Sequence, residues 1–341
     1  MNVIKNTIGV GLMIKNEEKE LESFLDQCIP FADCVCVVDT GSTDHSKEIA
    51  LTWSKKTGIT LYYIEAKRMV SEEVNGDWLI CDFALARNIY LEQLDSLVDY
   101  IFTASVGNII HEPAKIRDLV KSNHKVYGFT VKRGIADFTH HRLFKTKLGI
   151  QYHGKVHEYP DVFKVGEAPC SSGLTITHEA GNKTSQESST KRNLRILERV
   201  YKENPSPRTR FYYAMALRET GYISDAIRVY KEYLAGPTPY HDERMFAYYY
   251  LLKCYMNTNP TEVIRIGFKA LGEDQRFSEI TMFMAYAFFN SKKYDKALAM
   301  CLLAIQSPPN SAMFIEACKY KEEPLKMINQ IQDLKAARKN C

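Results

Sequence analysis

The chain has 341 residues, 45% hydrophobic and 25% charged, which is the composition of an ordinary globular protein with room for two domains. Its net charge of +4 is too small to indicate nucleic-acid or membrane binding. The nine cysteines form no CxxC pair, which favours a reducing compartment without a disulfide framework or zinc site. With no signal-peptide pattern and no apolar stretch of about 20 residues, a cytoplasmic protein is expected.

The first part of the chain alternates between strand-like and helix-like segments. Short apolar runs predict strands, and apolar residues three or four positions apart predict helices. Strands are expected at 8–14, 34–38, 61–64, 98–102 and 126–132, and helices at 17–28, 44–56, 83–94 and 113–121. Continuous apolar strands alternating with helices indicate an α/β fold whose mainly parallel sheet has flanking helices.

From about residue 191 onward the pattern is helical almost throughout. Segments 208–237 and 279–309 share a register, and a weaker unit lies at 242–272. The period of about 34 to 37 residues predicts an all-α domain of tetratricopeptide-like helical hairpins, with an unrelated helical bundle as the alternative. The polar segment 181–191 is interpreted as a linker between an N-terminal domain, 1–180, and a helical domain, 192–341.

Two polar motifs follow the first two predicted strands, where open α/β sheets bind their ligands. Asp39 ends the second strand, and its carboxylate can accept hydrogen bonds from a ribose or a base, while Gly41 lets the turn approach a ligand. Lys15, Asn16 and Glu17 end the first strand and would lie beside Asp39 if the two strands are neighbours. The alternative for both motifs is a turn that caps the next helix.

A third motif opens the helix predicted at 83–94. Arg87 and Asn88 lie about a turn and a half into this helix, and Asp82 precedes it. An arginine near strand ends can neutralise a pyrophosphate through paired hydrogen bonds. The alternatives are a helix cap for Asp82 and an exposed helix charge for Arg87.

Together with further short motifs, these form an ordered set that extends along most of the chain. The set consists of 8–50, Trp78, Asp82-Phe83, 86–88, 142–144, His157-Glu158, His178 and 193–198. In this order the sequence resembles inverting family 2 glycosyltransferases that carry tetratricopeptide repeats, some of which glycosylate cysteine or serine in small bacterial peptides. The resemblance implies a sheet of GT-A type, in which Glu17, Asp39, Asp82 and Arg87 hold the nucleotide of a donor such as a UDP-sugar.

The chain departs from this family at its metal motif. The family has Asp-x-Asp, usually followed by Glu, after the fourth strand, whereas this chain has Ser105, Gly107 and Asn108. Mg²⁺ and Mn²⁺ prefer carboxylate oxygens, so most of the metal affinity should be lost, and no metal ligand is assigned. Three outcomes stay open: basic groups such as Arg87 or Lys15 neutralise the diphosphate, a metal binds through other residues (His157, Glu158 or His111), or catalysis has been lost.

The resemblance also implies a catalytic pair. An inverting transfer needs a general base near the acceptor, and Glu158 and His157 are the candidates. Surface hydrogen bonding is the alternative for this pair. His178 is expected to close over the donor or to cap the last strand, and Ser105 and Gly107 remain in the expected donor site.

The sequence therefore predicts a transferase that moves a sugar from a nucleotide-sugar to a peptide, protein or other macromolecular acceptor. The expected donor is a UDP-sugar. The helical repeats would supply the acceptor surface or a homodimer interface. The run Tyr248, Tyr249 and Tyr250 is expected either on such a surface or in helix packing. The alternative function is a non-catalytic pseudo-glycosyltransferase that acts as a nucleotide-sugar-binding scaffold; a nucleic-acid partner is not expected.

Overall fold

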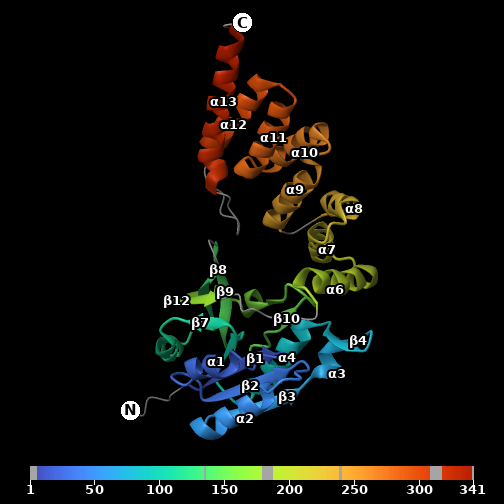
Figure 1. Ribbon diagram of the computed structural model, residues 1–341. Helices are drawn as coiled ribbons and strands as arrows, with labels where there is room; N and C mark the ends of the chain where they lie inside the picture. Colours follow the sequence, from blue (N-terminus) through green and yellow to red (C-terminus); the bar gives the residue numbers. More distant parts are fainter. Residues whose placement is uncertain (1–5, 134–135, 179–186, 238–239, 308–316, 340–341) are drawn as a thin grey trace. The chain divides into compact units, whose positions relative to one another are not determined.

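The computed structural model describes residues 6–133, 136–178, 187–237, 240–307 and 317–339 (Figure 1). Contacts divide the chain into two compact units, Met1–Gln186 and Glu187–Cys341. The first unit is α/β and the second is helical, with the elements in the order that Figure 1 labels.

The first unit is built on an eight-stranded sheet with the strand order β3-β2-β1-β6-β9-β8-β12-β7. Strands β3, β2, β1 and β6 are parallel neighbours, β8 and β12 form a second parallel pair, and β9 and β7 run antiparallel to their neighbours. The bounds are β1 (Ile8–Ile14), β2 (Cys34–Asp39), β3 (Thr60–Glu65), β6 (Tyr100–Ala104), β7 (Asn108–Ile110), β8 (Val126–Arg133), β9 (Ala136–Lys145) and β12 (Cys170–His178).

Helices cover both faces of the sheet because its strands carry apolar side chains on both faces. Helices α1 (Leu21–Cys28) and α2 (Ser46–Thr57) pack with Ile8, Val10 and Leu12 of β1 in one core. Helix α4 (Phe83–Asp95) packs on the other face in a second core. The predicted fold class, a mainly parallel α/β sheet with flanking helices followed by an all-α domain of helical hairpins, is confirmed.

Several elements differ from the prediction. The helix expected at 113–121 is three short pieces: η1 (Pro113–Lys115), α5 (Ile116–Leu119) and η2 (Val120–Ser122). The strand expected at 98–102 is β6, two residues later. Not expected at all were β7, α3 (Lys67–Val70), the hairpin of β4 (Ser71–Val74) and β5 (Asp77–Ile80), and η3 (Val162–Val165). No bounds were predicted for β9 and β12. Between 149 and 160 the chain forms a short ladder of β10 (Tyr152–His153) and β11 (Tyr159–Pro160).

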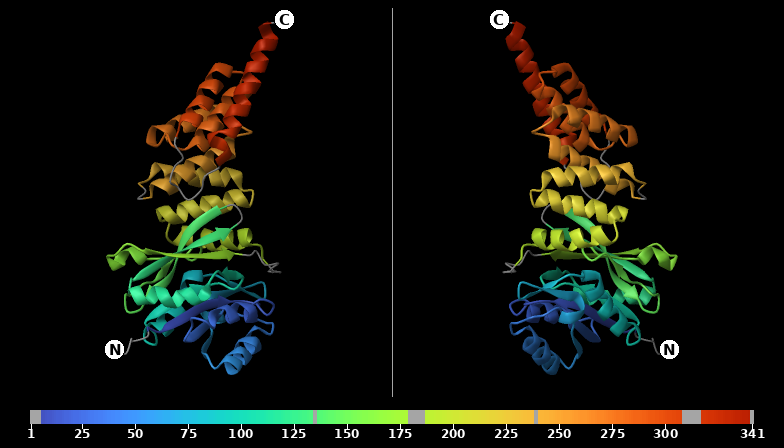
Figure 2. Two further views of the ribbon diagram at one scale, coloured as in Figure 1. Left: turned by 90° about the vertical axis from the view of Figure 1, so that its left-hand side faces the viewer. Right: turned by 90° about the vertical axis from the view of Figure 1, so that its right-hand side faces the viewer.

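The second unit is a succession of helices in which sequence neighbours pack on one another (Figure 2). They are α6 (Ser189–Glu203), α7 (Pro207–Glu219), α8 (Ile223–Ala235), α9 (His241–Tyr255), α10 (Pro260–Glu273), α11 (Ser278–Asn290), α12 (Tyr294–Gln306), η4 (Ala317–Tyr320) and α13 (Glu322–Lys339). Residues 189–191, expected in the linker, instead begin α6, which Ser188 caps; 181–186 lie outside the described residues. No helix in the described ranges is long and apolar enough to cross a membrane.

The repeat register predicted from the sequence corresponds to three helical hairpins: α7–α8, α9–α10 and α11–α12. In the shared register, five positions of the first hairpin correspond to five positions of the third, and all ten are buried: Ala214, Leu217, Ala226, Tyr230, Tyr233, Ala285, Phe288, Ala297, Cys301 and Ala304. Of the tyrosine run, Tyr248 and Tyr249 are 1% and 6% exposed and Tyr250, which is partly buried, stacks on Tyr230, so these residues serve mainly in helix packing.

A buried carboxylate holds the turn between α10 and α11. Asp274 accepts hydrogen bonds from the Arg276 guanidinium and from His241 Nε2 at 2.9 Å, and its side chain is 7% exposed. The Arg276 guanidinium holds the pKa of Asp274 well below its usual range, so Asp274 stabilises the folded state above an ordinary aspartate pKa. We expect Asp274→Asn to lower the free energy of unfolding by about 1 to 2 kcal/mol at pH 7.

The native carboxylate loses its stabilising effect as the pH falls toward its depressed pKa. The difference in free energy of unfolding between variant and wild type should therefore shrink below about pH 4. Urea unfolding followed by circular dichroism at pH 7 and pH 3 measures this. Asp295→Asn is the control, since the side chain of Asp295 is 88% exposed and its ion pair with Lys335 should contribute little. A gap that is equal at both pH values would contradict the ionic origin of the effect.

Candidate functional site

The carboxyl ends of three parallel strands meet at one edge of the sheet. Ile14 pairs with Asp39, and Leu12 pairs with Ala104. The residues that follow β1, β2 and β6 therefore lie side by side, and they include Lys15, Asp39 and Ser105. This is the edge at which open α/β sheets bind ligands.

Asp39 organises its own turn. Oδ1 accepts from the backbone N–H of Gly41 at 2.9 Å, from that of Ser42 at 2.7 Å and from the Ser42 hydroxyl at 2.9 Å. Oδ2 accepts from the Tyr63 hydroxyl at 2.6 Å. Burial and this bond raise the pKa of Tyr63, so its hydroxyl stays protonated and donating. Since one oxygen is fully used by the turn, a ligand could be bound by Asp39 only through Oδ2.

Asn16 and Glu17 join the β1 turn to the β2 turn. Asn16 adopts a left-handed φ of 54°, and its Oδ1 accepts from the Thr43 backbone N–H at 2.7 Å. The Glu17 backbone N–H donates to the Ser46 hydroxyl at 2.8 Å, and the residue is 8% exposed. The structure thus brings both predicted residues beside Asp39, with Asn16 in a bracing role.

Two lysines gather on one tryptophan beside this turn. Lys15 Nζ donates to the Trp78 carbonyl at 2.6 Å, and Lys67 Nζ lies 4.9 Å from the centroid of the Trp78 ring. The stem of Lys67 packs against Gly41, where a Cβ would lie only 3.0 Å from Lys67 Cγ, and the φ of Gly41 is +116°. Burial, and next the Lys67 ammonium, lower the pKa of Lys15.

Two residues expected to contact the donor serve the fold of this unit. Asp82 Oδ1 accepts from the Leu85 N–H at 2.8 Å, which makes Asp82 the N-cap of α4. Both ends of the Asn88 amide bind the Tyr152 main chain, Nδ2 to O at 3.0 Å and Oδ1 to N at 2.7 Å. In this structure Asp82 caps α4 through one oxygen and Asn88 anchors β10, and the donor roles expected for both side chains stay predictions.

Arg87 and Glu158 are 71 positions apart and form a largely buried ion pair, with Nε to Oε1 at 2.8 Å and side chains 11% and 16% exposed. Arg87 Nη1 also donates to the Tyr90 hydroxyl at 3.2 Å. Glu158 Oε2 has no hydrogen-bond partner within the described ranges. One oxygen of the predicted base is thus oriented by a guanidinium, and the other remains available to accept a proton.

A second arginine, Arg142 on β9, lies beside this pair. It is 8% exposed, and its guanidinium donates to the Thr103 carbonyl at 3.5 Å and to His140 Nδ1 at 3.2 Å. Burial, and to a smaller extent the charge of Arg87, lower the pKa of Arg142. Two arginines face one carboxylate here, so the site at the end of β6 carries an excess of positive charge.

The turn that carries His157 and Glu158 is conformationally strained. His157 has a left-handed φ of 52°, and Gly154 has a φ of +91° with a carbonyl 3.2 Å from where its Cβ would be. A non-glycine residue in this region costs free energy, and such residues are found at functional sites among other places. That this turn is functional stays a prediction.

The turn after β6 does not offer a metal site. Gly107 has a φ of +84°, and the Asn108 side chain is turned inward, where its Oδ1 accepts the Ser105 N–H at 3.2 Å. A hydroxyl, a glycine and an amide engaged with its own turn do not fit the needs of Mg²⁺ or Mn²⁺. Across the described parts of the chain no three His, Cys, Asp or Glu side chains group as metal ligands. His178 pairs with Asn108 in the sheet, and its side chain lies outside the description.

Sequence reasoning missed several residues of this site: Tyr63, Lys67, Tyr90 and Tyr152. Lys67 carried a usable signal, because it comes shortly after β3, the third of the parallel strands. The remaining residues meet the site through helix packing or strand pairing between distant segments, and no local pattern marks them.

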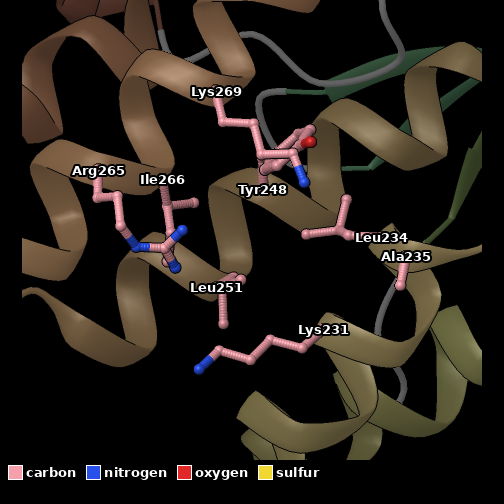
Figure 3. Close-up of a pocket in the computed structure, with 8 residues that line it drawn as sticks. All are labelled: Lys231, Leu234, Ala235, Tyr248, Leu251, Arg265, Ile266 and Lys269. Atoms are coloured by element: carbon pink, nitrogen blue, oxygen red, sulfur yellow. The ribbon is translucent and has the colours of Figure 1, made fainter.

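A shallow hollow with a volume of about 100 Å³ lies in the helical unit (Figure 3). Its floor is apolar and its rim is cationic. The lining comes from α8, α9 and α10: Lys231, Leu234, Ala235, Tyr248, Leu251, Arg265, Ile266 and Lys269. Arg265 is paired with Glu262, so Lys231 and Lys269 provide most of the positive charge.

Comparison with known proteins shows a similarity to glycosyltransferases. No family model matches the sequence. The chain is similar to the SPbeta prophage-derived glycosyltransferase SunS of Bacillus subtilis (strain 168), with 23% identity over 263 residues, and equally to glycosyltransferase SunS of Bacillus phage SPbeta. The match covers 73% of this chain and 58% of each relative, so the chain spans less than two thirds of their length. The resemblance to glycosyltransferases is therefore confirmed.

Two solved structures are distantly similar to this chain. The mannosyltransferase PcManGT from Pyrobaculum calidifontis, in complex with GDP-Man and Mn²⁺, has 14% identity and a TM-score of 0.42, over 80% of this chain and 89% of that one. MamA has 16% identity and a TM-score of 0.32, over 43% of this chain and 90% of that one.

Proposed function

We propose that this protein transfers a sugar from a nucleoside-diphosphate donor to a peptide or protein acceptor, with Glu158 as the general base. The observation that carries the proposal is the Arg87–Glu158 pair, at 2.8 Å, beside the strand ends that hold Lys15, Asp39 and Ser105. Similarity to a glycosyltransferase over 73% of the chain supports the reaction class.

The chemistry follows from a carboxylate with one oriented and one available oxygen. Glu158 Oε2 takes the proton from the acceptor nucleophile, whose oxygen or sulfur forms a bond to the anomeric carbon. The bond from that carbon to the diphosphate breaks, and the nucleoside diphosphate leaves with the electron pair. Attack from the face opposite the leaving group inverts the anomeric configuration.

Donor binding and acceptor binding are assigned to different units in this proposal. The edge of the sheet takes the nucleotide, for which a UDP-sugar is the first candidate. The helical unit takes the acceptor, and the hollow lined by Lys231 and Lys269 suits a segment with acidic and apolar side chains. A homodimer contact through the helices is the other use proposed for this unit.

The experiment is a donor panel with the purified full chain. UDP-, GDP- and dTDP-sugars are tested for binding and for release of free nucleotide, with Mg²⁺, with Mn²⁺ and with EDTA. We expect one nucleotide class to bind and to be hydrolysed slowly with water as the acceptor. If a donor binds without any turnover, even with a peptide acceptor supplied, the protein is a nucleotide-sugar-binding scaffold, the alternative favoured by the degenerate turn at Ser105. No binding at all would refute both functions.

A further inference from the structure

A donor diphosphate carries negative charge that must be neutralised as it leaves, and the turn after β6 has no carboxylate to hold a cation for this purpose. Ser105 and Gly107 offer no charge, and Asn108 is committed to the Ser105 N–H at 3.2 Å. Positive charge that reaches a diphosphate at this edge must therefore come from side chains. Lys15 and Lys67 are cationic side chains beside the Asp39 turn, through Trp78 and Gly41 respectively. Lys47 is also close to Asp39, but it is paired with Glu65.

The two ammonium groups are held together without a carboxylate partner. Within the described residues neither Lys15 nor Lys67 forms an ion pair, although Asp39 and Asp77 lie close enough to favour the charged form of Lys15. Lys15 is fixed by the Trp78 carbonyl and Lys67 by the face of the Trp78 ring. Two neighbouring like charges repel, and a doubly charged anion between them removes that repulsion.

We propose that Lys15 and Lys67, positioned by Trp78, bind the diphosphate of the donor directly and take the place of a divalent cation. This inference rests on the proposed function and identifies the groups that neutralise its leaving group. Lysine is suited to the task as a compact charge with three donors, and a group fixed before binding loses little freedom. The chain would then bind a nucleoside diphosphate in the absence of metal.

The test is calorimetric titration of the full chain with UDP, GDP and dTDP, in EDTA and again in MnCl₂. The nucleotide that binds most tightly should have the same affinity, within about threefold, in both buffers. Lys15→Met and Lys67→Met should each weaken binding in EDTA by about tenfold or more, the size expected for a charged hydrogen bond. Lys55→Met, on the exposed side of α2, is the matched control and should change nothing.

Each result has a distinct meaning. Lys15→Arg and Lys67→Arg keep the charge and should restore most of the affinity, which a purely structural loss would not allow; thermal melts identify any variant that is misfolded. Strong dependence of wild-type affinity on Mn²⁺ would overturn the inference and leave the proposed function standing. Unchanged affinity in both methionine variants would do the same. If none of the three nucleotides binds in either buffer, the inference and the proposed function both fail.

Discussion

Replacing Glu158 with glutamine is expected to reduce sugar transfer by about 100-fold or more, which is the contribution of a well-placed general base. Glutamine has the same shape, and its amide oxygen can still accept the bond from Arg87 Nε that now spans 2.8 Å. It cannot take a proton from an acceptor. The variant should therefore fold and bind the donor like the wild type while the chemical step is lost.

The measurement is release of free nucleotide, with peptide acceptors and with water alone, together with donor affinity and a thermal melt. Glu112→Gln is the matched control, because Glu112 forms an exposed ion pair with Lys115. It should leave turnover unchanged within about twofold, as expected for a surface pair. Turnover of Glu158→Gln at the wild-type rate would show that the base lies elsewhere, and His157, in its strained turn, would be the next residue to test.

The position of this site could be predicted from the sequence where it depends on strand ends. Lys15 and Asp39 each follow an apolar strand, and parallel neighbours bring their carboxyl ends to one edge. The same rule would have selected Lys67 after β3, but the short α3 and the β4–β5 hairpin break the periodicity on which the prediction relied. Polar residues in irregular segments of this kind have no pattern that marks them.

The roles of individual side chains were harder to predict than their location. Asp82 and Asn88 were expected to bind a donor, and the sequence did not reveal that both also form hydrogen bonds to the backbone, at a helix end and at a short strand. Such bonds depend on which main-chain groups come within reach after folding, and residue type alone does not reveal this. The Arg87–Glu158 pair was missed for the same reason, although both residues had been singled out separately.

The helical unit was predicted with better success because its signal is repeated. Ala214 and Ala285 occupy equivalent places in two hairpins, and both are buried where helices approach closely. The tyrosines at 248–250 show the limit of this reasoning, because a run of three aromatics in a helix must face more than one direction. Two of them are buried and the third, partly buried, is stacked on Tyr230, so the run serves mainly in packing.

Substituting Gly11 with alanine is expected to destabilise the first unit by about 2 kcal/mol or more, the cost of overpacking a dense core. Gly11 lies in the middle of β1, directly under α4. A Cβ at this position would lie 2.3 Å from Cδ2 and 2.6 Å from Cε2 of the fully buried Tyr90 ring. Because Tyr90 also accepts a hydrogen bond from Arg87, the displaced ring should disturb the orientation of Glu158 as well.

A double-mutant cycle tests this mechanism by chemical unfolding. Tyr90→Leu removes the ring that the new methyl group would meet, so Gly11→Ala combined with Tyr90→Leu should be about 1 kcal/mol less destabilised than the sum of the single variants. Strictly additive effects would contradict the proposed clash. Activity should not recover in the double variant, because leucine cannot accept the Arg87 hydrogen bond. The double variant would then recover part of its stability without recovering activity, which would show that the contact between β1 and α4 affects the two properties separately.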